Sequence, residues 1–119
     1  MIEQMERNGL RSQQLHINHV NIIGRMVTDP KISSLPGGRK VAQFSLATKE
    51  SYLDEEGTVR VKQTWHRMTA WGRWVTVVEE LCTKGLHIAV EGRLVTRFYR
   101  RNGKQQMFSE VEINDLIIL

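Results

Sequence analysis

The stretch TWHRMTAW at residues 64–71 places two tryptophans six positions apart with an arginine between them. In a β-strand, successive side chains point to opposite faces. One face of such a strand would carry aromatic, cationic and polar groups, namely Trp65, Arg67, Thr69 and Trp71. The other face would carry groups suited to a small core, namely His66, Met68 and Ala70. The stretch therefore predicts a strand with one buried face and one exposed platform on which a ligand lies.

Alternation of apolar and polar residues predicts five strands in all, over residues 15–27, 41–52, 59–71, 86–99 and 107–119. In the second of these, one face carries Ala42, Phe44 and Leu46. Gly24 inside the first strand indicates a bulge or a bend. Residues 28–40 contain Asp-Pro and Pro-Gly-Gly and are expected to form a loop, as is the acidic segment that ends at Gly57.

One helical period follows the third strand. Its apolar residues recur at intervals of three and four, as Trp74, Val77, Val78 and Leu81. Gly85 is the expected C-terminal stop of this helix. The dipeptide Asn102-Gly103 predicts a hairpin turn between the last two strands.

The order of three strands, a helix and two strands predicts an all-β protein, a five-stranded OB-fold Greek-key barrel with one helix between strands three and four. Another small barrel with an inserted helix is the alternative. Residues 1–14 are polar and lack a period, so we expect a flexible N-terminal arm before a single domain at residues 15–119.

The composition bounds the classes of partner. With 17 Lys and Arg against 13 Asp and Glu, the net charge of +4 suits a polyanionic partner. The single cysteine, Cys82, excludes a disulfide within the chain. The start of the chain lacks an apolar run, and there is no stretch of 18 apolar residues, so we expect a cytoplasmic protein with no membrane segment.

The fourth strand repeats the pattern of the third. Its predicted core face carries Ile88, Val90, Leu94 and Phe98, and its other face carries His87, Glu91, Arg93, Arg97 and Tyr99. Aromatic rings interleaved with guanidinium groups favour nucleic-acid binding, because bases stack on the rings and arginines pair with phosphates. For any single ring, packing under a loop or in a subunit contact is an equal alternative.

Other chemistry is not supported. His16 and His19 are three positions apart, which on a strand places them on opposite faces, so we expect no metal site and no cofactor. Glu55 and Glu56 lie in a loop among like charges and do not form an acid/base pair. Because no nucleophile has an adjacent base, we expect a protein that is not an enzyme.

Four segments together carry a resemblance to a known family: INHVNIIGRMVTDP, VAQFSLATKESY, TWHRMTAWGR and LCTKGLHIAVEGRLVTRFY. In order and nearly without gaps, about residues 17–117 resemble the bacterial single-stranded DNA-binding protein (SSB) family. The resemblance implies an OB-fold protomer that binds single-stranded DNA in replication, recombination and repair. It also implies a homotetramer, and a location in the cytoplasm with the nucleoid.

Carried over by position, the resemblance assigns the base-stacking rings to Tyr52, Trp65, Trp71 and Tyr99. It assigns contacts to DNA phosphates to Arg67, Arg73 and Arg97, with Arg93 beside them. Members of the family continue into an acidic tail that recruits repair proteins. This sequence stops at Leu119, so we do not expect tail-mediated recruitment from it. The loop after Tyr52 is acidic, so it should bind DNA phosphates less tightly than a basic loop would.

Subunit contacts are predicted from the first strand, where apolar residues occupy both faces. Leu15, Ile17, Ile23 and Val27 have the parity opposite to Val20, Ile22 and Met26. Since a single barrel buries only one face, we expect a second protomer to cover the other near Ile17, with His66 contributing, in a dimer of dimers.

The alternatives to an SSB are a primosomal replication-restart OB-fold accessory protein, a nuclease and a purely structural oligomer.

Overall fold

The computed structural model describes residues 15–119; the predicted arm at residues 1–14 lies outside the described residues. Within residues 15–119 there are six strands, one α-helix and one short 3-10 helix. The strands are β1 (Val20–Met26), β2 (Lys31–Ser34), β3 (Lys40–Leu53), β4 (Val59–Trp71), β5 (His87–Arg101) and β6 (Lys104–Ile118). The helices are η1 (Pro36–Gly38) and α2 (Arg73–Leu81).

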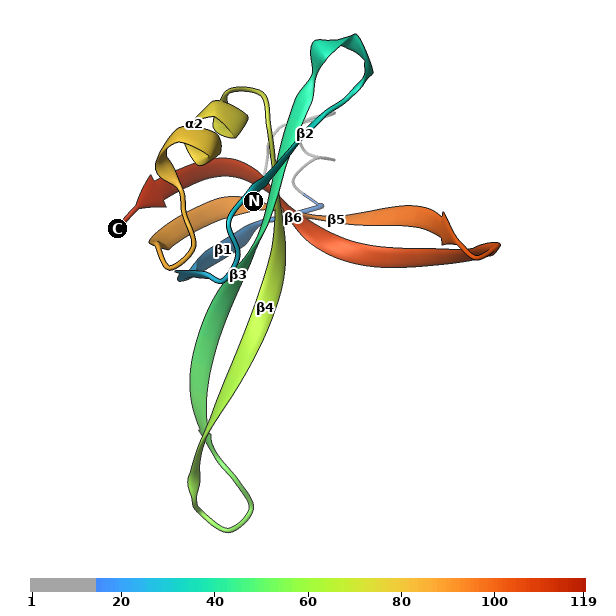
Figure 1. Cartoon of the computed structure of the whole chain (residues 1–119). Coiled ribbons are helices and arrows are strands. Elements are labelled where there is room, and N and C mark those ends of the chain that lie inside the picture. The colour runs from blue at the N-terminus through green and yellow to red at the C-terminus, as the bar shows by residue number, and fades with distance from the viewer. Residues whose placement is uncertain (1–14) are drawn as a thin grey trace.

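Five of the strands close into a barrel (Figure 1). The sheet order is β1-β5-β6-β4-β3-β2, and β1 also pairs with β3, which joins the two sides. The pairing of β4 with β6 is parallel, and the other pairings are antiparallel. With α2 between β4 and β5, this is the OB-fold, and the predicted all-β class and helix position are confirmed.

Gly24 lies where β1 passes from one partner strand to the other. β1 pairs with β5 from Val20 to Arg25 and with β3 at Arg25 and Met26. A Cβ atom at Gly24 would lie 2.3 Å from the carbonyl oxygen of Ala47 on β3. The position therefore requires glycine for the close approach that shuts the barrel. A bulge or a bend was expected at Gly24; a register shift is present between β5 and β6, at Glu91/Gly92.

The barrel interior is filled by apolar side chains from every side. The predicted inner faces of β3 and β4 are confirmed, since Phe44, Leu46 and Met68 are buried. The rest of the cluster comes chiefly from β1, β5, β6 and α2: Met26, Val75, Val78, Cys82, Ile88, Val90, Val111, Ile113 and Leu116. This core fixes the inner faces of the strands and so decides which side chains point outward.

Two predictions about the N-terminal half were wrong in extent. The first strand begins at Val20, not at Leu15. The expected loop at residues 28–40 contains β2, which pairs with β3 from Lys31↔Gln43 to Ser34↔Lys40. Pro and Gly after Ser34 mark the turn of this hairpin, and the strand before it is too short to show a clear alternation.

The buried side of the helix agrees only in part with the predicted one, which included Val78 and Leu81 but not Val75. Val75 and Val78 are its buried residues, whereas Leu81 is 59% exposed. The helix ends at Leu81, and the backbone N–H of Cys82 donates to the Val78 carbonyl. Gly85 lies beyond this end with φ 94°, where its N–H donates to the carbonyl of Met26, so it forms a later turn rather than the helix stop.

Two long hairpins, β3–β4 and β5–β6, project from the barrel in different directions (Figure 1). The turn of the β5–β6 hairpin is at Asn102 and Gly103, which have positive φ, as predicted. Leu94 and Phe98 were expected in the core but are 49% and 63% exposed. They have the parity of the core residues, but they lie toward the projecting end of β5. Among the described residues, no helix has the length and apolar character needed to cross a membrane.

Candidate nucleic-acid interface

The outer face of β4 carries the predicted platform. Trp65 is 60% exposed, Arg67 is exposed and Trp71 is half-buried. Thr69, predicted on the same exposed face, is only 1% exposed. It lies where β4 has a strand on each side, paired with Gln43 of β3 and with Glu112 of β6. The platform is therefore interrupted at its centre.

A second row of side chains lies beside β4 on the same outer face. The pairing Thr69↔Glu112 places Glu112 on this face of β6. Farther along the same face, β6 carries Glu110 and Phe108. On β5, Arg93 is the register partner of Glu112, and Arg97 is the register partner of Phe108. The structure thus brings Arg67, Arg93 and Arg97 onto one surface with Trp65 and Trp71.

Phe108 joins the two rows and was missed by sequence reasoning. The guanidinium carbon of Arg67 lies 4.2 Å from the centroid of its ring, within the range of a cation–π contact. The ring of Tyr99 meets it edge to face at 5.3 Å between centroids, and the Tyr99 hydroxyl donates to Gln106. Counting outward from the Asn-Gly turn would have placed Phe108 opposite Arg97.

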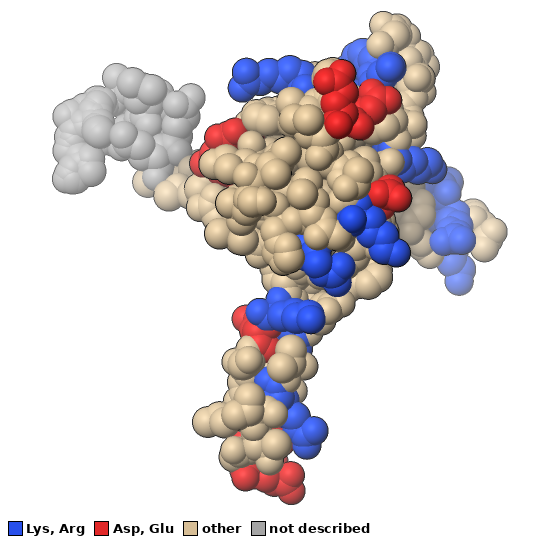
Figure 2. All heavy atoms as spheres, turned by 60° about the vertical axis from the view of Figure 1, so that its left-hand side comes forward, with Lys and Arg blue, Asp and Glu red and all other residues tan. Residues whose placement is uncertain are grey.

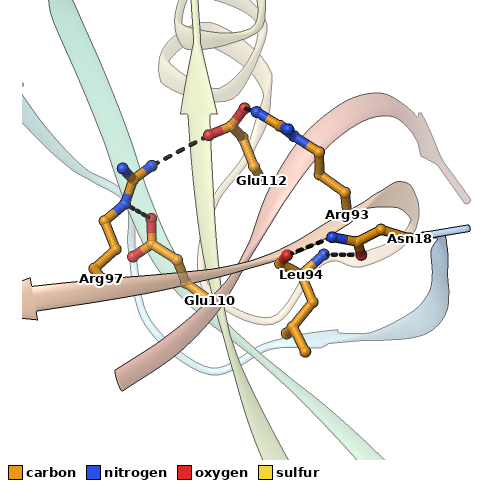
Figure 3. A network of polar contacts seen from close by, with 6 residues as sticks. All are labelled: Asn18, Arg93, Leu94, Arg97, Glu110 and Glu112. Carbon is orange, nitrogen blue, oxygen red and sulfur yellow. Dashed lines mark hydrogen bonds and ion pairs between the residues drawn. The ribbon is translucent and has the colours of Figure 1, made fainter. Parts of the chain in front are cut away.

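Arg93 and Arg97 of β5 are paired with carboxylates (Figure 3). Arg97 donates from Nε to Glu110 at 2.8 Å and from Nη2 to Glu112 at 3.1 Å. Arg93 donates from Nη2 to the other oxygen of Glu112 at 2.9 Å. The hydrogen bond that Arg97 donates to Glu110 is the main cause that raises the pKa of Arg97, so the guanidinium stays charged. Neither carboxylate was predicted at the site.

Arg97 and Glu112 also line an open cleft beside Trp71. The cleft has a volume of about 670 Å³, and its other walls are formed by η1, the start of β3 and α2. Arg39 lies over the Trp71 ring, with its guanidinium carbon 5.3 Å from the ring centroid. Arg39 and Lys40 add two cations to this cleft and were missed because the segment was read only as a turn.

Two of the predicted contacts lie apart from this surface. Arg73 is the first residue of α2, and its guanidinium lies over Trp74 at 4.9 Å. Tyr52 is 50% exposed on the β3–β4 hairpin and pairs with Arg60. Its parity along β3 places it on the opposite side of that hairpin from Trp65. A bound nucleic-acid strand would have to pass around the β3–β4 hairpin to contact both Tyr52 and Trp65.

Charge on the projecting β3–β4 hairpin is divided along its length. Figure 2 shows Lys and Arg side chains along this arm and acidic groups at its tip. At the tip, the Asp54 carboxylate accepts hydrogen bonds from Arg60 Nε and from the N–H groups of Glu56 and Thr58. Pairing with Arg60 is the main cause that lowers the pKa of Asp54. The acidic tip is thus an ordered turn.

The predicted subunit-contact residues are also placed. Ile17 is 87% exposed and precedes β1. His66 is half-buried on β4, with its Nε2 2.9 Å from the hydroxyl of Thr48. On the outer face of β1 and its neighbours, Ile23 is 67% and Ile117 58% exposed, around a hollow of about 190 Å³. An apolar face therefore exists, centred on β1 and β6 rather than on Ile17.

A closed barrel of this strand order, with rings and arginines on one outer sheet face, defines an OB-fold protein of the oligonucleotide-binding class. Residues 17–119 match the Single-strand binding protein family. The chain belongs to that family, as its sequence motifs predicted.

Individual relatives agree with this assignment. Over 105 residues, 87% of this chain, the sequence is 32% identical to Single-stranded DNA-binding protein 1 of Chlorobaculum tepidum. That alignment covers 65% of the relative, so this chain spans less than two thirds of its length.

Solved structures show the same similarity. The Plasmodium falciparum SSB in complex with ssDNA gives a TM-score of 0.81 at 35% identity, covering 87% of this chain and 96% of that one. The wild-type single-stranded DNA binding protein from Thermus aquaticus gives 0.74 at 30% identity, covering 87% of this chain and 50% of that one.

Proposed function

We propose that the protein binds single-stranded DNA without regard to sequence and protects it during replication, recombination and repair. The observation that carries the proposal is the exposed Trp65 on the same sheet face as Arg67 and Trp71. Stacking on aromatic rings accepts any base, because every base has a π-face, and it leaves the base edges unread. The similarity to an SSB that was solved with ssDNA supports the same ligand.

Binding without catalysis fits the chemistry of this surface. On the outer face Arg97 is paired with Glu110 and Glu112, an arrangement that positions charge rather than activating a nucleophile. We therefore propose a cytoplasmic protein that coats single strands and is not an enzyme. Incubation with labelled single strand and magnesium should leave the strand uncut.

A titration of single-stranded and duplex DNA at several salt concentrations tests the proposal. Affinity for oligo(dT) should far exceed affinity for a duplex of the same length, since bases in a duplex are not free to stack. The logarithm of the affinity should fall with the logarithm of salt by about 0.7 for each phosphate contacted. Equal affinity for the two forms, or no response to salt, would contradict the proposal.

We further propose that the protein assembles as a homotetramer, a dimer of dimers. The exposed apolar groups Ile23, Ile117 and Leu119 lie around β1, where a second copy would cover them through a two-fold contact. Light scattering should give a mass near four chains. Ile17→Asp, His66→Tyr and, most strongly, Ile23→Asp should lower that mass. A stable monomer at micromolar concentration would contradict the assembly and leave DNA binding untouched.

A further inference from the structure

One carboxylate on the proposed DNA-binding face bridges two arginines. Glu112 accepts from Arg93 through Oε1 at 2.9 Å and from Arg97 through Oε2 at 3.1 Å (Figure 3). The two guanidinium groups therefore hold one anion between them. A DNA phosphate likewise presents two charged oxygens, so one phosphate can accept a hydrogen bond from each arginine in the same way.

The bridge is within reach of a ligand. The side chains of Arg93, Arg97 and Glu112 are 53%, 37% and 20% exposed. Glu112 also lines the cleft that contains Trp71, so the bridge borders a ring on which a base can stack. A nucleotide whose base lies on Trp71 would bring its phosphate close to these arginines.

The neighbouring carboxylate has a different character. Glu110 is 1% exposed and binds Arg97 Nε through Oε2 at 2.8 Å, while its other oxygen has no hydrogen-bond partner within residues 15–119. Glu110 is buried in the sheet and holds Arg97 in position through this hydrogen bond. Glu112 is the more accessible of the two and so the one that an incoming anion can replace. With both in place, two positive charges face two negative ones.

We propose that Glu112 is an internal substitute for a phosphate group, which a DNA phosphate must displace before Arg93 and Arg97 can contact it. The inference rests on the proposed binding of single-stranded DNA. Exposed ion pairs are weak, so the exchange is feasible. Glu112 therefore lowers the affinity for single-stranded DNA and makes that affinity less dependent on salt. The reason is that the two arginines are paired with an anion both before and after DNA binds.

Neutralising Glu112 tests this directly. Glu112→Gln keeps the side-chain shape and removes the charge, and Glu80→Gln on the exposed side of α2 is the control with the same change in net charge. Fluorescence titration with oligo(dT) should show tighter binding by Glu112→Gln. Its salt slope should be steeper by about 0.7, because one carboxylate charge is removed and Arg97 stays paired with Glu110. Its advantage over wild type should then shrink about 2.5-fold between 50 and 200 mM salt.

A double-mutant comparison separates release of the arginines from a general charge effect. Arg93→Ala should reduce the salt slope more in the Glu112→Gln background than in the wild-type background. Equal reductions in both backgrounds would overturn the inference, as would a Glu112→Gln slope equal to that of Glu80→Gln.

Thermal unfolding and the wild-type titration complete the test. A Glu112→Gln protein, or a Glu112→Ala protein, that loses thermal stability without a change in slope would show that Glu112 serves the fold, which also overturns the inference. If the wild-type protein fails to prefer single strands over duplex, the proposed function itself fails, which is a separate result from these.

Discussion

Replacing Trp65 by alanine removes the most exposed ring of the platform with little disturbance of the core. A fully buried tryptophan covers roughly 200 Å², and Trp65 is 60% exposed. A stacked base that covers about half of the exposed part of the ring removes roughly 60 Å² from water, which at ~25 cal/mol per Å² is about 1.5 kcal/mol. That value lies within the range of about 1–3 kcal/mol for a base on an aromatic ring. The dissociation constant for oligo(dT) should therefore rise about 12-fold.

The assay is a fluorescence titration with oligo(dT), followed by thermal unfolding of the same samples. Because Trp65 is exposed, its loss should cost at most about 0.5 kcal/mol of stability. Trp74→Ala is the matched control, since Trp74 is half-buried on α2 and packs against the core. It should lower the thermal midpoint and leave affinity near that of wild type. A Trp65→Ala protein that has a lowered thermal midpoint yet binds DNA normally would refute the assignment of Trp65 to the DNA-binding face of β4.

Three further changes test other parts of the structure. Gly24→Ala would place a Cβ 2.3 Å from a β3 carbonyl oxygen, so the barrel should lose about 3 kcal/mol or fail to fold, and a wild-type denaturation curve would argue against this closure. Phe108→Leu removes the ring under Arg67 and should weaken oligo(dT) binding about fivefold in the same titration. The pKa of Asp54 is lowered chiefly by Arg60, so its charged form orders the hairpin tip at neutral pH and that order is lost as pH falls below about 4. Asp54→Asn should speed hydrogen exchange of the Thr58 backbone amide at pH 7, and at low pH its exchange rate should match that of wild type. Equal protection of this amide at pH 7 would contradict the role of Asp54 in ordering the hairpin tip.

Local patterns carried much of the fold. The alternation in residues 64–71 was enough to place Met68 and Ala70 inside and Trp65 and Arg67 outside, because the period of a strand is a local property. The hairpin at Asn102-Gly103 was equally readable, since positive φ at both positions favours those residue types. The short sequence motifs are local signals too, and the family that they predicted was confirmed over residues 17–119.

Tertiary structure decided what lies beside each strand. Thr69 has the parity of Trp65, yet it is buried because β6 pairs with β4 at that point and not at Trp65. Leu94 shares its parity with core residues, yet it is half exposed because it follows Gly92, the last buried residue of β5. Strand pairing and strand length, which join residues distant in sequence, set both outcomes.

The candidate site shows the same division. The sequence determined that arginines and rings alternate on two strands. The pairing of β5 with β6 determined that Glu112 bridges Arg93 and Arg97, and the pairing of β4 with β6 determined that Phe108 lies under Arg67. Charge pairing depends on the distance between side chains from different strands, and a one-dimensional pattern does not contain that distance until the register is known.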